Sequence, residues 1–131
     1  MKVIIPGNTQ IVEGEWATYW FDVDGILYAL SKGLQKGIQR ILSNFEVAKQ
    51  MAQNKKVCML VYVNNFPLFN NATQKMVSND MAERYNAVAL VAKSAMRKQL
   101  MNLFLKLKPS AIPIKSFTNE NEARQWLKKF V

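Results

Sequence analysis

The chain has 131 residues, of which 50% are hydrophobic and 21% are charged, a composition that suits one folded domain spanning residues 1–131. It contains no histidine and one cysteine, which excludes a Ser-His-Asp triad, a Cys-His pair, cysteine-cluster metal sites and an internal disulfide. The net charge is +9, and most of the excess follows residue 65, where eleven Lys and Arg accompany four Asp and Glu.

The N-terminal apolar stretch is too short for a signal peptide. No window reaches the roughly 20 apolar residues that a membrane-spanning helix needs. Cys58 lies within an apolar run and is interpreted as a reduced core residue. An unpaired cysteine without an export signal predicts a cytoplasmic protein.

Residues 15–31 have the pattern of a β-hairpin, because Asp24-Gly25 between apolar runs is typical of a two-residue turn. The turn predicts three pairs on one face of the hairpin: Val23 with Ile26, Phe21 with Tyr28, and Tyr19 with Leu30. Trp16 and Trp20 are expected in the core, the alternative being an aromatic platform for a partner, lipid or base.

Residues 32–42 are ambiguous, since their helical apolar spacing is interrupted by Gly33 and Gly37. The segment Ser43-Asn44-Phe45-Glu46 has the form of a capping box, in which the serine hydroxyl and the glutamate satisfy first-turn N–H groups. We therefore predict a helix that begins there and runs to about Gln53.

Strands and helices then alternate. The continuous apolar runs 57–63 and 87–92 predict strands buried on both faces, and 112–117 predicts a short strand. Three helices are expected here. The first covers 72–84, with Ala72, Met76 and Val77 facing inward, and the second covers 94–108. The last is capped by Thr118 and has Ala123, Trp126, Leu127 and Phe130 facing inward. This order predicts an α/β fold: a mixed, largely parallel sheet with an N-terminal antiparallel hairpin.

Ser94 is expected to cap the helix 94–108, and Pro109 to end it. Its longest apolar stripe is expected to face the core: Met96, Leu100, Leu103, Phe104 and Leu107. By helical angle, Met101 and Leu105 lie off that stripe, beside basic residues. This flank is either an ordinary solvated surface or a docking face that combines apolar and basic groups.

The sequence resembles the SpoIIAA-like family of STAS/SEC14-type domains, and is similar in particular to uncharacterised stand-alone bacterial members. The segments that carry the resemblance are Asp24-Gly25-Ile26-Leu27, 59–65, 87–94, 102–109, 113–117 and 122–127. The resemblance implies a small α/β domain with helices mainly on one side of a mixed sheet. The matched positions are mostly structural, so they concern fold more than activity. An enzyme is not expected, because the usual general base and metal ligands are absent.

Anti-sigma-factor antagonists of this family carry an Asp-Ser-Ser motif whose phosphorylated serine switches partner docking. The matching positions here are Asn70, Asn71 and Ala72, so the acid and both hydroxyls are missing. Thr73 is the nearest hydroxyl and is interpreted as an ordinary first-turn residue. We therefore do not expect the phosphorylation switch.

We predict a non-enzymatic docking or regulatory module whose partner is another protein or a second copy. The candidate surface joins the loop at 64–73 and the neighbouring helix that starts at Ser94, on the ligand side of the sheet: Asn70, Asn71, Thr73, Ser94, Arg97, Lys98, Met101 and Leu105. The alternative is a SEC14-like domain that binds a lipid or another apolar ligand beneath the hairpin and approaches an anionic membrane through its basic surface.

No cofactor or metal is expected, since the five glycines form no phosphate-binding loop. Nucleic-acid binding is not expected either, because the hairpin aromatics are accompanied mostly by acids.

Overall fold

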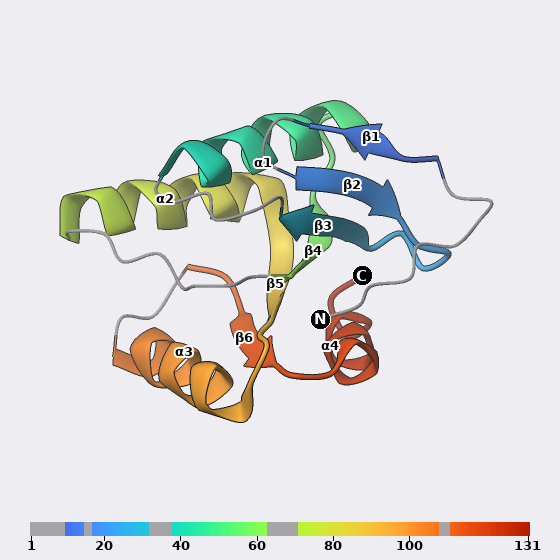
Figure 1. The fold of residues 1–131 in the computed structure, drawn as a ribbon. Helices are drawn as coiled ribbons and strands as arrows, with labels where there is room; N and C mark the ends of the chain where they lie inside the picture. Colours follow the sequence, from blue (N-terminus) through green and yellow to red (C-terminus); the bar gives the residue numbers. More distant parts are fainter. Residues whose placement is uncertain (1–9, 15–16, 32–37, 63–70, 108–110) are drawn as a thin grey trace.

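A mixed β-sheet organises the molecule (Figure 1). The computed structural model describes residues 10–14, 17–31, 38–62, 71–107 and 111–131. In these ranges the strands lie in chain order: β1 (Val12–Glu13), β2 (Ala17–Phe21), β3 (Leu27–Ser31), β4 (Val57–Tyr62), β5 (Tyr85–Val91) and β6 (Ile114–Phe117). β1, β2 and β3 pair antiparallel, and β3 to β6 pair parallel, which confirms the predicted sheet.

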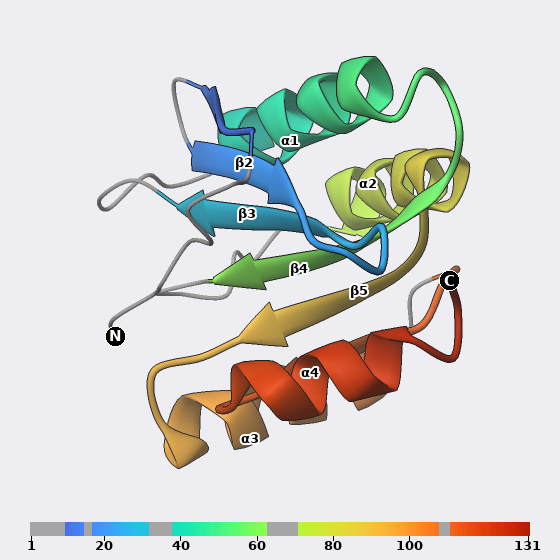
Figure 2. The ribbon, with the colours of Figure 1, turned by 90° about the vertical axis from the view of Figure 1, so that its right-hand side faces the viewer.

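Helices cover both faces of the sheet unequally. They are α1 (Ile38–Met51), α2 (Asn71–Arg84), α3 (Ala95–Leu107) and α4 (Glu120–Leu127). Phe45 of α1, Val77 of α2 and Met101 of α3 belong to one buried cluster, whereas Ala123 and Leu127 of α4 belong to the other. Figure 2 shows α4 alone in front of the sheet, which confirms the expectation that most helices lie on one side.

The hairpin between β2 and β3 has a longer turn than predicted. The Asp22 N–H donates to the Ile26 carbonyl at 3.0 Å, and one Asp22 carboxylate oxygen accepts from the Asp24 and Ile26 N–H groups at 2.8 and 3.0 Å. Gly25 completes the turn with φ of 80°, a conformation that favours glycine. These bonds favour a five-residue connection, residues 22–26, instead of the predicted two-residue turn.

The longer turn shifts the predicted register by one residue. Trp20 pairs with Tyr28 and Phe21 with Leu27, so the expected partners Val23–Ile26, Phe21–Tyr28 and Tyr19–Leu30 are wrong. A one-residue shift exchanges the two faces of a strand. Tyr19 therefore joins the α1 side, while Trp20 and Tyr28 join the α4 side.

Two predicted helix starts also differ. α1 begins at Ile38, so the expected capping box lies inside the helix, where the Ser43 side chain hydrogen-bonds Tyr19 instead of capping. α4 is capped by Asn119 rather than Thr118, because the Asn119 side chain accepts from the Glu122 N–H at 3.1 Å. The predicted strands at 57–63, 87–92 and 112–117 and the helix at 72–84 are confirmed within one or two residues where the structure describes them.

Inward side chains of α2 follow the prediction in part. Val77 is buried, whereas Met76 is exposed and the Ala72 side chain lies outside the described residues. Ala123 and Leu127 of α4 are buried, and Trp126 of α4 and Phe130 just after it are half-buried against them, as predicted.

Cys58 is a free cysteine in the core, as predicted, with its sulfur 3.8 Å from the Leu127 carbonyl of α4. Burial raises the pKa of its thiol to about 11 from an ordinary value of 9.0. A raised pKa means that the folded state keeps the proton, so the stabilisation is complete below pH 9 and is lost as the pH rises toward 11.

Replacing Cys58 with alanine should therefore flatten the alkaline loss of stability. We expect the free energy of unfolding of the natural protein to fall by about 2–3 kcal/mol relative to Cys58→Ala between pH 8.5 and pH 11, at 1.36 kcal/mol per pKa unit. Urea unfolding at several pH values measures this, and the buried tyrosines common to both proteins cancel. Parallel pH profiles would contradict the assignment.

Candidate docking surface on helix α3

Helix α3 is fixed to the sheet edge by one asparagine. The Asn102 carboxamide oxygen accepts from the Ser116 N–H at 2.8 Å, and its nitrogen donates to the Ser116 carbonyl at 3.3 Å. β6 is the last strand of the sheet, so this side chain satisfies backbone groups that an edge strand leaves unpaired. The Ser94 hydroxyl accepts from the Arg97 N–H at 3.2 Å, which confirms the predicted cap.

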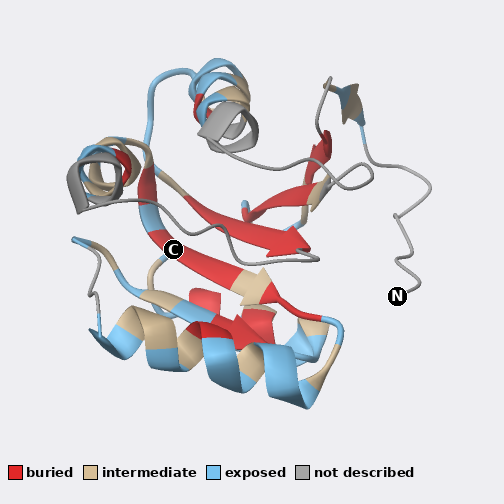
Figure 3. Cartoon of the chain, turned by 60° about the vertical axis from the view of Figure 1, so that its left-hand side comes forward, coloured by how far each residue is buried: buried red, intermediate tan, exposed pale blue. Residues whose placement is uncertain are grey.

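The packing of α3 on the sheet buries the side of the helix opposite to the one predicted. Met101 is only 3% exposed and belongs to the core cluster on the α1 and α2 side, and Leu105 is half-buried. Figure 3 shows that much of the outer side of this helix is exposed. Of the expected inward stripe, Phe104 is half-buried, whereas Met96, Leu100, Leu103 and Leu107 are 54–72% exposed. We call these four residues the α3 stripe. The prediction that Met101 belongs to an exposed docking flank is wrong, because Asn102 directs its own side of the helix to β6.

Basic residues accompany the α3 stripe. α3 contains Arg97, Lys98 and Lys106, Lys93 precedes it, and no Asp or Glu occurs between residues 93 and 107. Arg97 and Lys106 are exposed and Lys98 is half-buried. The surface therefore combines a row of apolar side chains with positive charge and no acid of its own.

The structure brings together only part of the predicted site. Ser94 caps α3, and Arg97, Lys98, Met101 and Leu105 lie on it. Asn70 lies outside the described residues; Asn71 and Thr73 occupy the first turn of α2, and their side chains also lie outside that description. The residues that sequence reasoning missed are those of the α3 stripe, whose helical spacing was visible but was assigned to the core.

A polar cluster lies between α4 and the sheet. The Tyr62 hydroxyl donates to the Glu120 carboxylate, and burial together with Glu120 raises the pKa values of Tyr62 and Tyr28 well above the ordinary range. Both hydroxyls therefore keep their protons well into the alkaline range. Across the described residues, no three His, Cys, Asp or Glu side chains are grouped as a metal site would need.

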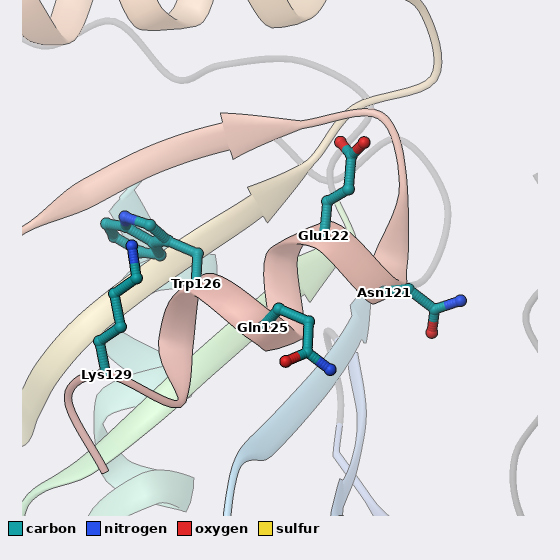
Figure 4. Close-up of a pocket in the computed structure, with 5 residues that line it drawn as sticks. All are labelled: Asn121, Glu122, Gln125, Trp126 and Lys129. Carbon is teal, nitrogen blue, oxygen red and sulfur yellow. The ribbon is translucent and has the colours of Figure 1, made fainter.

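A shallow groove of about 410 Å³ follows the outer side of α4 (Figure 4). Its lining comes from a single stretch of chain: Asn121, Glu122, Gln125, Trp126 and Lys129. The Trp126 ring lies 5.7 Å from that of Phe117 and 5.0 Å from that of Phe130, which holds it against the domain. A wall made by one helix encloses a ligand on one side only, so this groove lacks the enclosure typical of small-molecule sites.

The space beneath the hairpin is occupied by aromatic side chains. Trp20 and Tyr28 are both buried and stack with ring centroids 5.3 Å apart. This places Trp20 in the core, as expected, whereas Trp16 lies outside the described residues. The lipid-binding alternative expects its apolar ligand beneath the hairpin, where these two rings belong to the buried cluster on the α4 side.

Residues 19–131 match the family described as "Domain of unknown function (DUF7793)". The chain belongs to this family. Comparison with curated proteins gives no match. No helix among the residues described for this DUF7793 chain has the length and apolar character to cross a bilayer.

Among solved structures, the DUF7793 chain is similar to an uncharacterised protein of the DUF3478 family with a SpoIIAA-like fold, from Shewanella loihica PV-4. The two are 13% identical, the match covers 97% of this chain and 98% of the other, and the TM-score is 0.50. At that identity the likeness concerns fold alone. It confirms the SpoIIAA-like fold that the sequence resemblance implied.

Proposed function

We propose that this DUF7793 protein is a non-enzymatic docking module that binds another protein through the α3 stripe. The observation that carries the proposal is the exposure of four large apolar side chains at positions i, i+4, i+7 and i+11 of one helix. Single exposed leucines are normal on protein surfaces, whereas a contiguous apolar row indicates an interaction site.

Burial of the stripe supplies the affinity for such a partner. Covering a Leu or Met side chain completely contributes about 1.5–3 kcal/mol. The domain leaves more than half of each stripe side chain exposed, so a partner with a complementary apolar face gains free energy by covering the rest. The basic residues near the stripe then add orientation and a faster association rate. The protein is expected to do this in the cytoplasm, without the Asp-Ser-Ser switch.

Site-specific photo-crosslinking tests the proposal. A photoreactive amino acid placed at Leu103 in the cells that naturally produce the protein should form an adduct with a discrete protein. The matched control is the same amino acid at Val23, an apolar residue that is 97% exposed at the tip of the hairpin. Adducts that are equal at both positions, or adducts with lipid alone at Leu103, would contradict a protein partner.

Binding measurements with purified proteins then give the contribution of the α3 stripe to the affinity. The protein identified at Leu103 should bind the natural chain, and Leu103→Glu should weaken binding at least 30-fold, because a central interface position contributes about 2 kcal/mol or more. Val23→Glu, which makes the same change away from α3, should leave the affinity unchanged. Isothermal titration calorimetry measures both. An equal effect of the two substitutions would overturn the proposal.

A further inference from the structure

We infer that the partner docks as an acidic amphipathic helix packed along α3, an inference that rests on the proposed docking function. The stripe residues are spaced four, three and four positions apart, which is the spacing of the a and d positions of a heptad repeat. Eleven residues of helix rise about 16 Å, so the seam is about three turns long. That length matches three turns of a facing helix.

The other side of the heptad is already used. With Met96 and Leu103 at d and Leu100 and Leu107 at a, Met101, Asn102 and Leu105 fall at positions b, c and f. Met101 is buried, Leu105 is half-buried and Asn102 is bonded to Ser116. The domain thus holds α3 by the side that a coiled-coil helix normally exposes, and directs the seam outward.

The width of the stripe favours a helix over a lipid surface. At 100° per residue the four side chains fall within roughly 60° around the helix axis, a strict a/d seam. A helix lying on a membrane has a broader apolar face, and its polar side remains in water. Here the side opposite the stripe is packed into the domain, so α3 has the geometry of one helix in a pair.

Charge defines the partner. The positions that flank the seam are Arg97 and Phe104 at e, and Gln99 and Lys106 at g, which include two cations and no acid. Residues at e and g pair with charges of the facing helix, so carboxylates there match α3. A second copy would instead add two more cationic residues, its own Arg97 and Lys106, to an interface between chains that each carry +9.

Two matched peptides test this inference. Each has three heptads with leucine at a and d; one carries glutamate at e and g, the other lysine. We expect the glutamate peptide to bind the full chain at least tenfold more tightly, with a preference that shrinks between 50 and 500 mM salt. Fluorescence anisotropy measures affinity, and amide chemical shifts locate the peptide on α3.

Variants then separate the two claims. Leu100→Glu should abolish binding of the glutamate peptide, Lys106→Glu should weaken it at least threefold, and Val23→Glu should have no effect. If both peptides bind equally and Leu100→Glu abolishes both, the docking surface stands and the acidic partner is wrong. A concentration-dependent dimer that Leu100→Glu dissociates would overturn the acidic helix in favour of a second copy.

Binding to lipid vesicles through the α3 stripe would contradict both the protein partner and the acidic helix. Vesicles of phosphatidylcholine with phosphatidylserine that retain the natural chain but not Leu100→Glu, while neither peptide binds, would assign the α3 stripe to a lipid surface. If neither peptide nor vesicles bind, the acidic helix is overturned, and the crosslinking at Leu103 decides separately whether another protein docks there.

Discussion

Met101→Glu should strongly destabilise the protein, whereas Leu100→Glu, one residue away, should leave its stability unchanged. Met101 is 3% exposed within the cluster that includes Val88 and Ala92. A carboxylate there loses its hydration, and the methionine contacts are lost as well. We expect a loss of about 4 kcal/mol or more, a large part of the roughly 5–15 kcal/mol that stabilises most domains.

The neighbouring position provides the contrast. Leu100 points away from the core, so a glutamate there stays hydrated, and its effect should lie within about 0.5 kcal/mol. Urea unfolding followed by circular dichroism measures both variants. Met101→Leu is the control for volume, since a swap of similar size in a core costs less than about 1.5 kcal/mol.

The reverse result would identify the reverse orientation of α3. If Leu100→Glu unfolded the chain and Met101→Glu did not, the long apolar stripe would face the core, as its periodicity predicts. The two variants therefore test the docking surface itself, before any partner is known.

The orientation of α3 could not be predicted from the periodicity of the sequence. The helix has a long apolar row that contains Leu100 and Leu103 and a short one that contains Met101 and Leu105. Periodicity predicts burial of the longer row. Burial of the shorter one follows from the bonds between Asn102 and Ser116, 14 residues apart, and local spacing contains no information on that pairing.

The sheet was predictable because its strands carry their own signal. Val57–Tyr62 and Tyr85–Val91 contribute side chains to both buried clusters, one on each face of the sheet, and burial on both faces requires the continuous apolar runs seen in the sequence. The hairpin register was not predictable from Asp24-Gly25 alone. It depends on Asp22, whose carboxylate bonds the Ile26 N–H four residues on and so selects the longer turn.

Loss of the Asn102 side chain should release α3 from the sheet edge. In Asn102→Ala, the Ser116 N–H and carbonyl lose their partner while Ser116 itself is fully buried. Two backbone groups left unsatisfied cost about 1–3 kcal/mol each, so we expect a loss of about 2–6 kcal/mol. Gln99→Ala, which removes a similar amide from the exposed side of the same helix, should cost less than about 0.5 kcal/mol.

Hydrogen exchange separates this bond from a general loss of packing. The Ser116 amide should exchange at least tenfold faster in Asn102→Ala relative to amides of the central strand β4 in the same protein. Asn102→Asp should recover little stability, because it keeps the acceptor for the Ser116 N–H but places a second oxygen against the Ser116 carbonyl. Equal costs for the changes at residues 99 and 102 would show that the bond does not orient α3. The exposed seam would then need another cause.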